Sequence, residues 1–282
     1  MYSIIHNNVT YTVRVPTYPV NLIVDHYVIM KGKGLSLPER LFPNNKAEIF
    51  FNLGDKVTGI NNISASTPIL KESTISGVRT TFFDFLPAEN HFMVGLRFSL
   101  FGFGLLFKIP ANEFTDNNFS TEEVWGREMK FLVERLRDAS QDVEQLINIL
   151  NEWIINCLAK RSLSEINQWS RLEQKFWTPN LPVTELLNRY VGYTHKHAIH
   201  LVKNNCGVPP KHIQKVNRFN HALRLISSTS FRNWGQLAYQ TGYADQSHLI
   251  REFRHFSGYT PEEYLLLKPR EYCKNMILPK VQ

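Results

Sequence analysis

The sequence predicts an α+β protein built from two parts. The first is a small β-barrel or sandwich followed by two helices, and the second is an all-α domain in which a long helix joins two helix-turn-helix motifs. Three observations lead to this fold class. Short β-branched and aromatic runs fill about the first 115 residues. Apolar residues recur at helical spacing after them. One residue pattern occurs twice near the C-terminus. We place the boundary between residues 1–165 and residues 166–282.

The charge of the chain is divided unevenly between these two parts. Residues 1–165 hold 16 Lys and Arg against 18 Asp and Glu, a net charge of −2. Residues 166–282 hold 16 against 7, a net charge of +9. A basic second part indicates a polyanion-binding module. A basic membrane-surface patch is the rival interpretation, although the basic residues lie among glycine turns and apolar helix cores.

Cysteine usage and apolar runs indicate a cytoplasmic protein. Cys157, Cys206 and Cys273 are isolated from one another, which fits a reducing compartment and neither a disulfide framework nor a zinc site. The first residues lack the layout of a signal peptide. Charges or glycines interrupt every apolar run well before ~18 residues, so we expect no membrane partner.

The N-terminal part reads as short strands separated by Gly, Pro and Asn. The expected strands are residues 11–15, 22–29, 48–53, 80–85 and 92–98, with a glycine-rich turn at residues 101–104. Several aromatic side chains in this part could line a ligand pocket or form ordinary core, namely Phe42, Phe50, Phe51, Phe83 and Phe85.

The sequence carries none of the common catalytic or metal-binding patterns. His6, His26 and His91 are far apart and form no metal-ligand spacing, and no GxSxG, GxxxxGK or HExxH pattern occurs. The histidines 195, 197 and 200 cannot converge on one metal, because residues two apart on a helix point to different sides. We therefore expect no catalytic residue, no metal and no cofactor.

Helical periodicity begins after the strands. Residues 122–139 are expected to form one helix, and residues 143–158 carry an apolar stripe from Val143 to Leu158. These two helices could pack onto the barrel or onto a second subunit. Residues 161–178 are polar and are expected to form a linker with some helix.

Residues 237–264 read as helix, turn, helix, turn, helix. Gly242 can take the positive φ of a sharp turn, and Asp245 can cap the next helix. The apolar stripe of that helix is Leu249, Phe253 and Phe256. Residues 260–263 form a capping box with proline at the first helical position.

The same pattern occurs about 50 residues earlier. Ala198 corresponds to Leu249, and Val202 stands where the second copy has Phe253, so the first copy has a smaller core. Between the copies, residues 210–227 read as one helix. Its ~18 residues span ~27 Å, close to the ~34 Å between successive major-groove faces. One rigid helix could therefore place both motifs on one side of a duplex.

An exposed face of amide, basic and aliphatic side chains suits base reading, although a solvated basic face is the alternative. Gln pairs with adenine, Arg with guanine, and Ile contacts a thymine methyl group. Lys203 and Arg254, further along their helices, suit phosphate. The first helix should begin at Thr194. The expected DNA-binding residues are Lys196, Ile199, His200 and Lys203 in the first helix and Gln246, Ser247, Ile250, Arg251 and Arg254 in the second.

The second copy resembles the second helix-turn-helix of the AraC/XylS family of bacterial transcription regulators. The matching residues are Ala238, Gly242, Tyr243, Asp245, Ser247, His248, Leu249, Arg251, Phe253, Gly258, Thr260, Pro261 and Tyr264. Residues 37–54 look like the N-terminal sensor-type domain of a subset of that family. The resemblance places base contacts at positions 196, 199, 200, 246, 247 and 251, with Tyr243 and His248 structural.

The resemblance implies a sequence-specific transcription regulator with a sensor or dimerisation domain in residues 1–165 and a DNA-binding domain in residues 166–282. Its expected partners are double-stranded promoter DNA, a small-molecule effector in the N-terminal domain, a second copy of the chain, and RNA polymerase. Two alternatives remain: a DNA-repair alkyltransferase or glycosylase that carries the same type of DNA-binding module, and a protein-binding adaptor.

Overall fold

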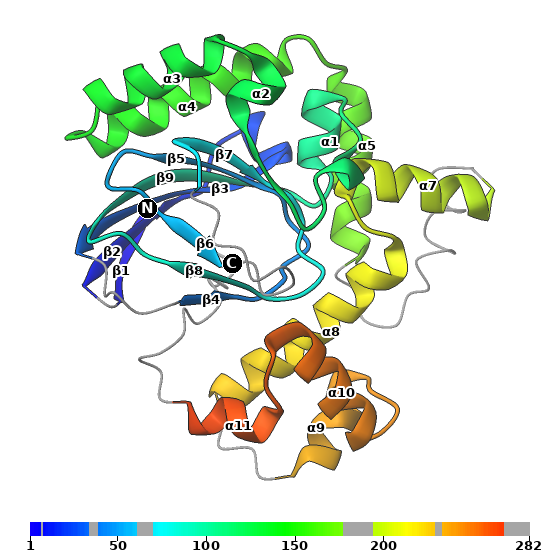
Figure 1. Cartoon of the computed structure of the whole chain (residues 1–282). Coiled ribbons are helices and arrows are strands. Elements are labelled where there is room, and N and C mark those ends of the chain that lie inside the picture. Colours follow the sequence, from blue (N-terminus) through cyan, green and yellow to red (C-terminus); the bar gives the residue numbers. More distant parts are fainter. Residues whose placement is uncertain (7, 34–38, 61–69, 177–193, 229–232, 268–282) are drawn as a thin grey trace.

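The computed structural model describes residues 1–6, 8–33, 39–60, 70–176, 194–228 and 233–267. In these residues two antiparallel sheets face each other, with helices outside them (Figure 1). The larger sheet runs in the order β1-β2-β3-β9-β5-β7-β10, with β1 at Tyr2–His6, β2 at Val9–Arg14, β3 at Val24–Lys33, β9 at Asn90–Phe98, β5 at Glu48–Asn52, β7 at Ser73–Ser76 and β10 at Asn118–Ser120. The smaller sheet runs β4-β8-β6, with β4 at Glu39–Leu41, β8 at Phe83–Leu86 and β6 at Thr58–Ile60.

Alternation along the strands divides the side chains between the two faces of the larger sheet. Val9, Tyr11 and Val13 of β2 are buried in the cluster that also contains Phe50 and Phe85. Phe51, the neighbour of Phe50 on β5, belongs to the separate cluster beneath the helices. The period of two in a strand explains why adjacent phenylalanines have different partners.

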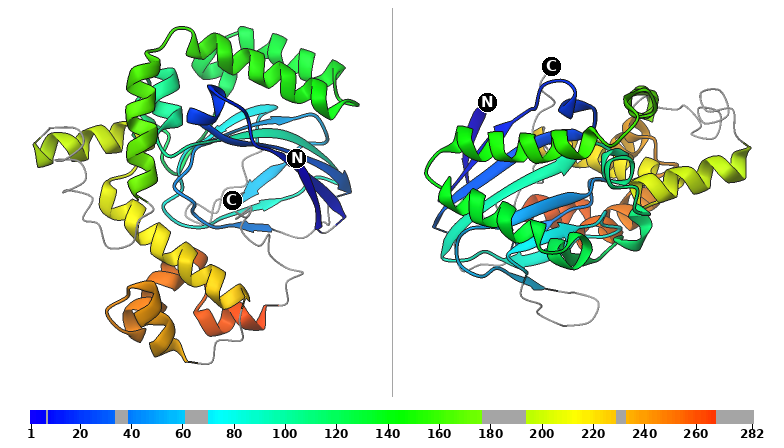
Figure 2. Two further views of the ribbon diagram at one scale, coloured as in Figure 1. Left: turned by 180° about the vertical axis from the view of Figure 1, so that it is seen from behind. Right: turned by 90° about the horizontal axis from the view of Figure 1, so that it is seen from above.

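Two long helices cover the outer face of the larger sheet. They are α3 (Glu128–Asp138) and α4 (Val143–Leu158). Leu136 of α3 and Leu150 of α4 are fully buried in one cluster with Phe51 and Leu96 of the sheet. Figure 2 shows both helices lying over the sheet. The interpretation in which these helices pack within their own chain is confirmed.

Several predicted elements differ from the structure. The helix expected at residues 122–139 is divided at Gly126, which has φ +76°, into α2 (Thr121–Trp125) and α3. The expected turn at residues 101–104 begins α1 (Gly102–Phe107). Short polar strands β4, β6, β7 and β10 and the edge strand β1 were not expected. Two single-turn helices, η1 (Val20–Leu22) and η2 (Ala111–Glu113), also occur.

The expected linker with some helix is instead a packed helix along most of its length, α5 (Leu163–Phe176). Ile166, Trp169 and Leu172 are buried at 1%, 7% and 2% exposure, and Trp169 packs on Phe101 with ring centroids 4.8 Å apart. A stripe at spacings of three residues turns a polar-looking segment into a packed helix. This helix crosses the boundary that we placed between residues 165 and 166.

All regular elements in the described residues of the C-terminal part are helices. Its helices are α7 (His195–Cys206), α8 (Pro210–Ser228), α9 (Trp234–Thr241), α10 (Gln246–Ser257) and α11 (Pro261–Leu266). The predicted long helix is confirmed as α8, and the side chains of its predicted stripe are buried: Ile213, Val216, Phe219, Ala222, Leu223 and Ile226. The part of the first motif that precedes Thr194 lies outside the described residues, as does Cys273.

The two motifs pack against different neighbours. Phe253 and Phe256 of α10 share a cluster with Phe219 of α8. Ala198 and Val202 of α7 belong instead to the large cluster of the β part. Figure 1 shows α7 beside α1 and α5, away from α9–α11. The first motif is therefore docked on the N-terminal part of the chain.

The small residues of α7 permit this docking. Ala198, Val202 and Cys206 are exposed by 1%, 0% and 2%. A Cβ atom on Gly104 of α1 would lie 2.5 Å from the backbone oxygen of Asn205, which is far inside van der Waals contact. Only glycine allows two helices this close. The small buried side chains of α7, which the sequence shows, are thus accompanied by a closer approach of the neighbouring helix α1.

Candidate nucleic-acid interface

The second motif turns where the sequence predicts. Gly242 has φ +79°, and the N–H of Tyr243 donates to the oxygen of Ala238 at 2.9 Å. The Asp245 carboxylate accepts from the N–H of His248 at 2.7 Å, which confirms the predicted N-cap. At the far end, Thr260 and Glu263 form the predicted capping box. The Asp245 contact fixes the start of α10, and the capping box fixes the start of α11, the helix that follows it.

One face of α10 is buried and the other is exposed. Leu249, Phe253 and Phe256 are exposed by at most 1%, as their spacing predicts. The proposed base-reading side chains lie elsewhere on the helix. Gln246, Ser247, Arg251 and Arg254 are exposed and Ile250 is half-buried. Arg254 lies near Glu263, with Nη2 to Oε1 at 3.8 Å.

A buried polar network holds α10 on α8, and the sequence analysis missed it. Arg218 of α8 donates to Glu252 of α10, with Nη2 to Oε1 at 2.7 Å. The Arg218 guanidinium lies 4.5 Å from the centroid of the Tyr243 ring, which meets His248 edge-on. Tyr243 and His248 are therefore structural, as expected. Glu252 lies two turns from Asp245, and only its placement on the apolar side of α10 could have indicated a buried partner.

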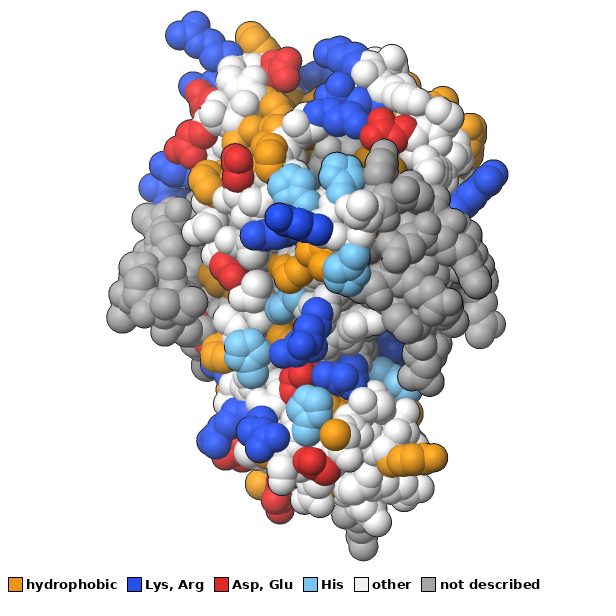
Figure 3. Space-filling model, turned by 90° about the vertical axis from the view of Figure 1, so that its right-hand side faces the viewer, with side chains coloured by type: hydrophobic (Ala, Val, Ile, Leu, Met, Phe, Trp, Pro, Cys, Tyr) orange, Lys and Arg blue, Asp and Glu red, His pale blue; other side chains and the backbone are white. Residues whose placement is uncertain are grey.

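The first motif presents its exposed face on α7. Thr194 is the N-cap residue, as predicted, although its side chain makes no capping hydrogen bond. Lys196, His200 and Lys203 are exposed and Ile199 is half-buried. The His200 ring lies within hydrogen-bond distance of Asn204, with Nε2 to Nδ2 at 3.0 Å. In Figure 3, Lys, Arg and His side chains follow one another down this side of the molecule.

Comparisons with known families agree with this geometry. Residues 187–266 match a family described as a helix-turn-helix domain. The C-terminal segment is an AraC-type helix-turn-helix domain. Residues 13–120 match a family described as a domain of unknown function, DUF6597. No curated protein sequence is detectably similar to the chain.

Solved structures of ToxT from Vibrio cholerae resemble the fold over most of both chains. An unliganded variant is 14% identical with a TM-score of 0.44, and covers 86% of this chain and 97% of that one. A second ToxT structure is 15% identical with a TM-score of 0.42, covering 85% and 97%. A third, bound to an unsaturated fatty acid, is 13% identical with a TM-score of 0.41, covering 86% and 96%.

The β part contacts the AraC-type domain through residues 39–47. Arg40 binds Asp84 through two hydrogen bonds of 2.7 Å and donates from Nη1 to the oxygen of Ser257 at 3.1 Å. The Asn45 side chain donates to the oxygen of Ile213 at 3.1 Å. Phe42 belongs to the same hydrophobic cluster as the second motif. Residues 39–47, from β4 to the start of β5, therefore form part of the surface on which α8 and α10 pack.

The described cysteines do not have the environment of reactive thiols. Cys206 is buried and its Sγ donates to the oxygen of Val208 at 3.2 Å, and burial raises the pKa of its thiol to about 12. Burial also raises the pKa of the Cys157 thiol. Nucleophilic cysteines need a lowered pKa and access to solvent. Neither thiol suits the alkyltransferase alternative.

Across the described ranges, no three His, Cys, Asp or Glu side chains come together in a way that could hold a metal ion. None of the helices in that part of the chain combines the length and apolar character needed to cross a bilayer.

Proposed function

We propose that this protein is a one-component transcription regulator, in which α7 and α10 read promoter DNA and the β part controls them. The observation that carries the proposal is the second motif. Its helix α10 is capped at Asp245 and seated on α8 by its buried stripe, so its polar and basic face is free for the major groove.

Each residue on these two helix faces has a chemical role in this proposal. Gln246 pairs with adenine and Arg251 with guanine, Ser247 with either, and Ile199 and Ile250 contact thymine methyl groups. Lys196 and His200 make the base contacts of the first motif. Lys203 and Arg254 bind phosphate. The 19 residues of α8 span ~28 Å, which suits two adjacent major-groove faces.

The experiment is a selection of bound sequences from genomic fragments by the full chain, followed by footprinting. We expect one protected sequence with two half-sites about one helical turn apart. The double variant Gln246→Ala/Arg251→Ala should lose this preference. Lys130→Ala on α3, where Lys130 pairs with Glu122 at 2.9 Å, is the control and should keep it. Equal affinity for all sequences at every salt concentration would contradict the proposal.

The proposal includes control by a small-molecule effector, by a second copy of the chain, or by both, and a contact with RNA polymerase at the promoter. Phe131 on α3 and Ile155 on α4 are exposed by 66% and 47%, and a dimer through these helices would bury them. Sedimentation of the full chain and of Phe131→Asp tests the dimer. Transcription from the selected promoter with purified polymerase, with and without the protein, tests the last contact.

A further inference from the structure

The buried side chains of α8 change partners along the helix. Ala198 and Val202 of α7, and Ile213 near the start of α8, belong to the hydrophobic cluster of the β part. From Val216 onwards the buried stripe of α8 belongs instead to the cluster of the second motif, together with Phe253 of α10. The two proposed reading helices, α7 and α10, therefore lie in different clusters, and α8 crosses from one cluster to the other.

Asn45, between β4 and β5, holds α8 where this change occurs. Its side chain is buried, and Nδ2 donates to the oxygen of Ile213 and to Oδ1 of Asn217, both at 3.1 Å. Ile213 lies on the side of the β part and Asn217 on the side of the second motif. One turn further along α8, Nδ2 of Asn220 donates to the oxygen of Pro43 at 3.1 Å. One short segment of the β part therefore holds α8 on both sides of the change.

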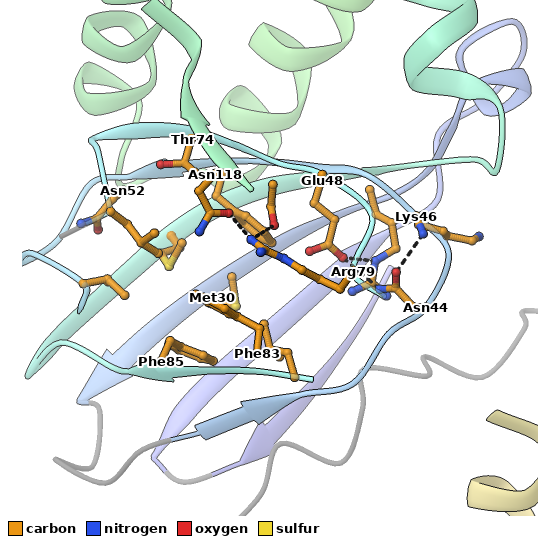
Figure 4. A pocket seen from close by; sticks show the side chains of 18 of the residues that line it. Met30, Asn44, Lys46, Glu48, Asn52, Thr74, Arg79, Phe83, Phe85 and Asn118 are labelled. Carbon is orange, nitrogen blue, oxygen red and sulfur yellow. Dashed lines mark hydrogen bonds and ion pairs between the residues drawn. The ribbon is translucent and has the colours of Figure 1, made fainter. Parts of the chain in front are cut away.

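The backbone of Asn45 is itself held in place. It has φ +62°, a left-handed conformation that Asn adopts more readily than most residues. Its neighbours Asn44 and Lys46 line a cavity of about 90 Å³ between the two sheets, where Oδ1 of Asn44 accepts from the N–H of Lys46 at 2.9 Å (Figure 4). Nζ of Lys46 also pairs with Asp25 at 2.9 Å. The segment therefore presents Asn45 to α8 from a fixed turn.

Phe42 adds an apolar contact from the same segment. Its ring lies 5.9 Å from that of Phe219 on α8 and 6.0 Å from that of Tyr264 on α11. It also lines the cavity, as do all but one of the five aromatic residues that the sequence left open between core and pocket: Phe42, Phe50, Phe83 and Phe85. The exception, Phe51, lies on the opposite face of the larger sheet. Polar and apolar contacts thus join residues 42–45 to the second motif.

A second contact holds the C-terminal end of α10. Arg40 of β4 binds Asp84 of β8 through Nε and Nη2, and its Nη1 donates to the oxygen of Ser257, the last residue of α10, at 3.1 Å. The hydroxyl of Thr81 donates to the oxygen of His255 at 2.8 Å. The last carbonyl groups of a helix lack partners within it, and a cation near them is favourable. The β part therefore caps the proposed reading helix of the second motif.

The contacts around Arg40 leave little room for α10 to shift. Its guanidinium lies 3.9 Å from the centroid of the Phe82 ring and 4.7 Å from that of Tyr259. Gly258 follows α10 with φ +78°, and a Cβ atom on it would lie 2.9 Å from the Phe82 ring and closer still to Nη1 of Arg40. This close packing fixes the end of α10 relative to the smaller sheet.

We propose that Asn45 and Arg40 are positioning residues for DNA recognition. The helix α7 is docked on the β part at Gly104, and these two residues hold α8 and α10 on the same part. The β part therefore fixes the distance between the two reading helices, and one chain accepts only one spacing between its two half-sites. This inference rests on the proposed function, because it requires that α7 and α10 both read DNA.

A change in half-site spacing is a large displacement for such a pair of helices. One additional base pair moves a half-site by ~3.4 Å along the duplex and turns it by ~35°. Two helices on one rigid support cannot both follow this displacement, so one of them loses its base contacts. If the support is loosened, the second motif can follow the displaced half-site.

Binding of the full chain to the selected site, with its own spacing and with one base pair added or removed between the half-sites, tests this inference. We expect the wild type to prefer the selected spacing roughly tenfold or more. Asn45→Gly removes the amide contacts and permits the positive φ. It should reduce the preference to roughly threefold or less, because its second motif is less rigidly supported. Asn8→Gly makes the same change at φ +63° in the turn between β1 and β2, and should keep the wild-type preference.

Arg40→Lys is the second variant. It keeps a cation beside Asp84, but a lysine lacks the planar fork that binds Asp84 and Ser257 together. It too should accept the altered spacings. Its control is Arg14→Lys, at the pair of Arg14 with Glu144 on α4, which should reject them as the wild type does. If Asn45→Gly is unfolded by circular dichroism, Arg40→Lys decides.

Three outcomes in these variants would overturn the inference. An unchanged spacing preference would show that α8 alone sets the distance between the reading helices. A loss of affinity by the same factor at every spacing would mean that Asn45 and Arg40 only stabilise the fold. A gain by the same factor at every spacing would mean that the β part holds the second motif away from DNA. A wild-type chain that prefers no sequence would contradict the proposed function instead.

Discussion

Arg218 on α8 donates three hydrogen bonds to Glu252 on α10, from Nε to Oε1 at 3.1 Å and from Nη2 to Oε1 and Oε2 at 2.7 and 2.9 Å. The Glu252 side chain is exposed by only 7%. The contact joins the helix that links the motifs to the helix that we propose reads DNA. The orientation of α10 therefore depends on an ion pair as well as on its apolar stripe.

Arg218→Met should destabilise the second motif, because it leaves the Glu252 carboxylate buried without a partner. Breaking one side of a buried pair costs roughly 3 kcal/mol, and the partial exposure of Arg218 reduces that value. Urea unfolding measures it. Arg218→Met/Glu252→Leu should regain part of the loss. Arg254→Met, which removes an exposed pair at 3.8 Å, is the matched control and should change stability little. Additive losses in the double variant would contradict coupling.

Arg251 and Arg254 should differ in what they contribute to DNA binding. Arg251→Ala should cost ~1–3 kcal/mol on the selected site and relax preference at one base pair, with little effect on random DNA. Arg254→Ala should weaken both DNAs alike and reduce the salt dependence by about one counterion. Fluorescence anisotropy at several salt concentrations separates the two. An equal loss on random DNA for Arg251→Ala would show that it contacts only phosphate.

The docking of α7 on the N-terminal part predicts an unusual response to a helix-favouring substitution. Alanine for glycine inside a helix normally stabilises by up to ~1 kcal/mol. Gly104→Ala should instead destabilise, because its Cβ would lie 2.5 Å from the oxygen of Asn205. Amide hydrogen exchange in the variant should then be faster than in the wild type in α7 and unchanged in α9–α11. Gly235→Ala in α9, where the nearest contact is the Asn233 side chain at 3.3 Å, is the control. Unchanged exchange in α7 would contradict the docking.

The elements that were predicted well carry local signals. Asp245, Gly242 and the capping box at Thr260 each act within a few residues, so sequence order reports them directly. The stripes of α8 and α10 are long enough to fix both the helix and its buried face. The strand β7 (Ser73–Ser76) has no apolar alternation that would predict a strand. It is a strand because it pairs with β5 and β10, which are distant in sequence.

The contacts that escaped prediction join residues far apart in sequence. Arg218 and Glu252 are separated by 34 positions, and Arg40 and Ser257 by 217. Gly104 read as part of a turn, because its close approach to Asn205 exists only in the folded chain. The proposed DNA-reading residues required only a helix face, and the cavity required knowing which strands face one another. Residue patterns thus predicted the motifs, whereas the way in which the motifs pack on the rest of the chain could be seen only in the structure.

Stability should depend on pH through His91. Burial lowers its pKa to about 4 from an ordinary value of 6.5, so between these values the unfolded chain binds a proton that the folded chain does not. The stabilisation is present above pH ~6.5 and is lost as the pH falls towards 4. From pH 7 to pH 5 it amounts to about 2 kcal/mol. Urea unfolding of wild type and His91→Gln at both pH values measures it. An identical pH dependence in the variant would contradict this prediction.

The two reading helices should contribute differently to recognition. The α10 helix has Gln246 and Arg251 on its exposed face and is seated within the second motif, whereas α7 has Lys196 and His200 and is docked on the β part. Gln and Arg make bidentate base contacts, while Lys binds as a point charge. We expect α10 to dominate sequence discrimination and α7 to add affinity that falls with salt.

The measurement compares Lys196→Ala/His200→Ala with Gln246→Ala/Arg251→Ala on selected and random DNA. The first pair should weaken binding to both DNAs and flatten the salt dependence, and it should lower the ratio of specific to random affinity less than the second pair, because Lys196 binds as a point charge. The second pair should reduce the ratio of specific to random affinity. If the first pair abolishes that ratio while the second leaves it unchanged, the roles are reversed. That result would mean that docking against Gly104 positions α7 for base contacts better than the ion pair of Arg218 and Glu252 positions α10. The reason would be that a more rigidly supported helix meets the bases more precisely.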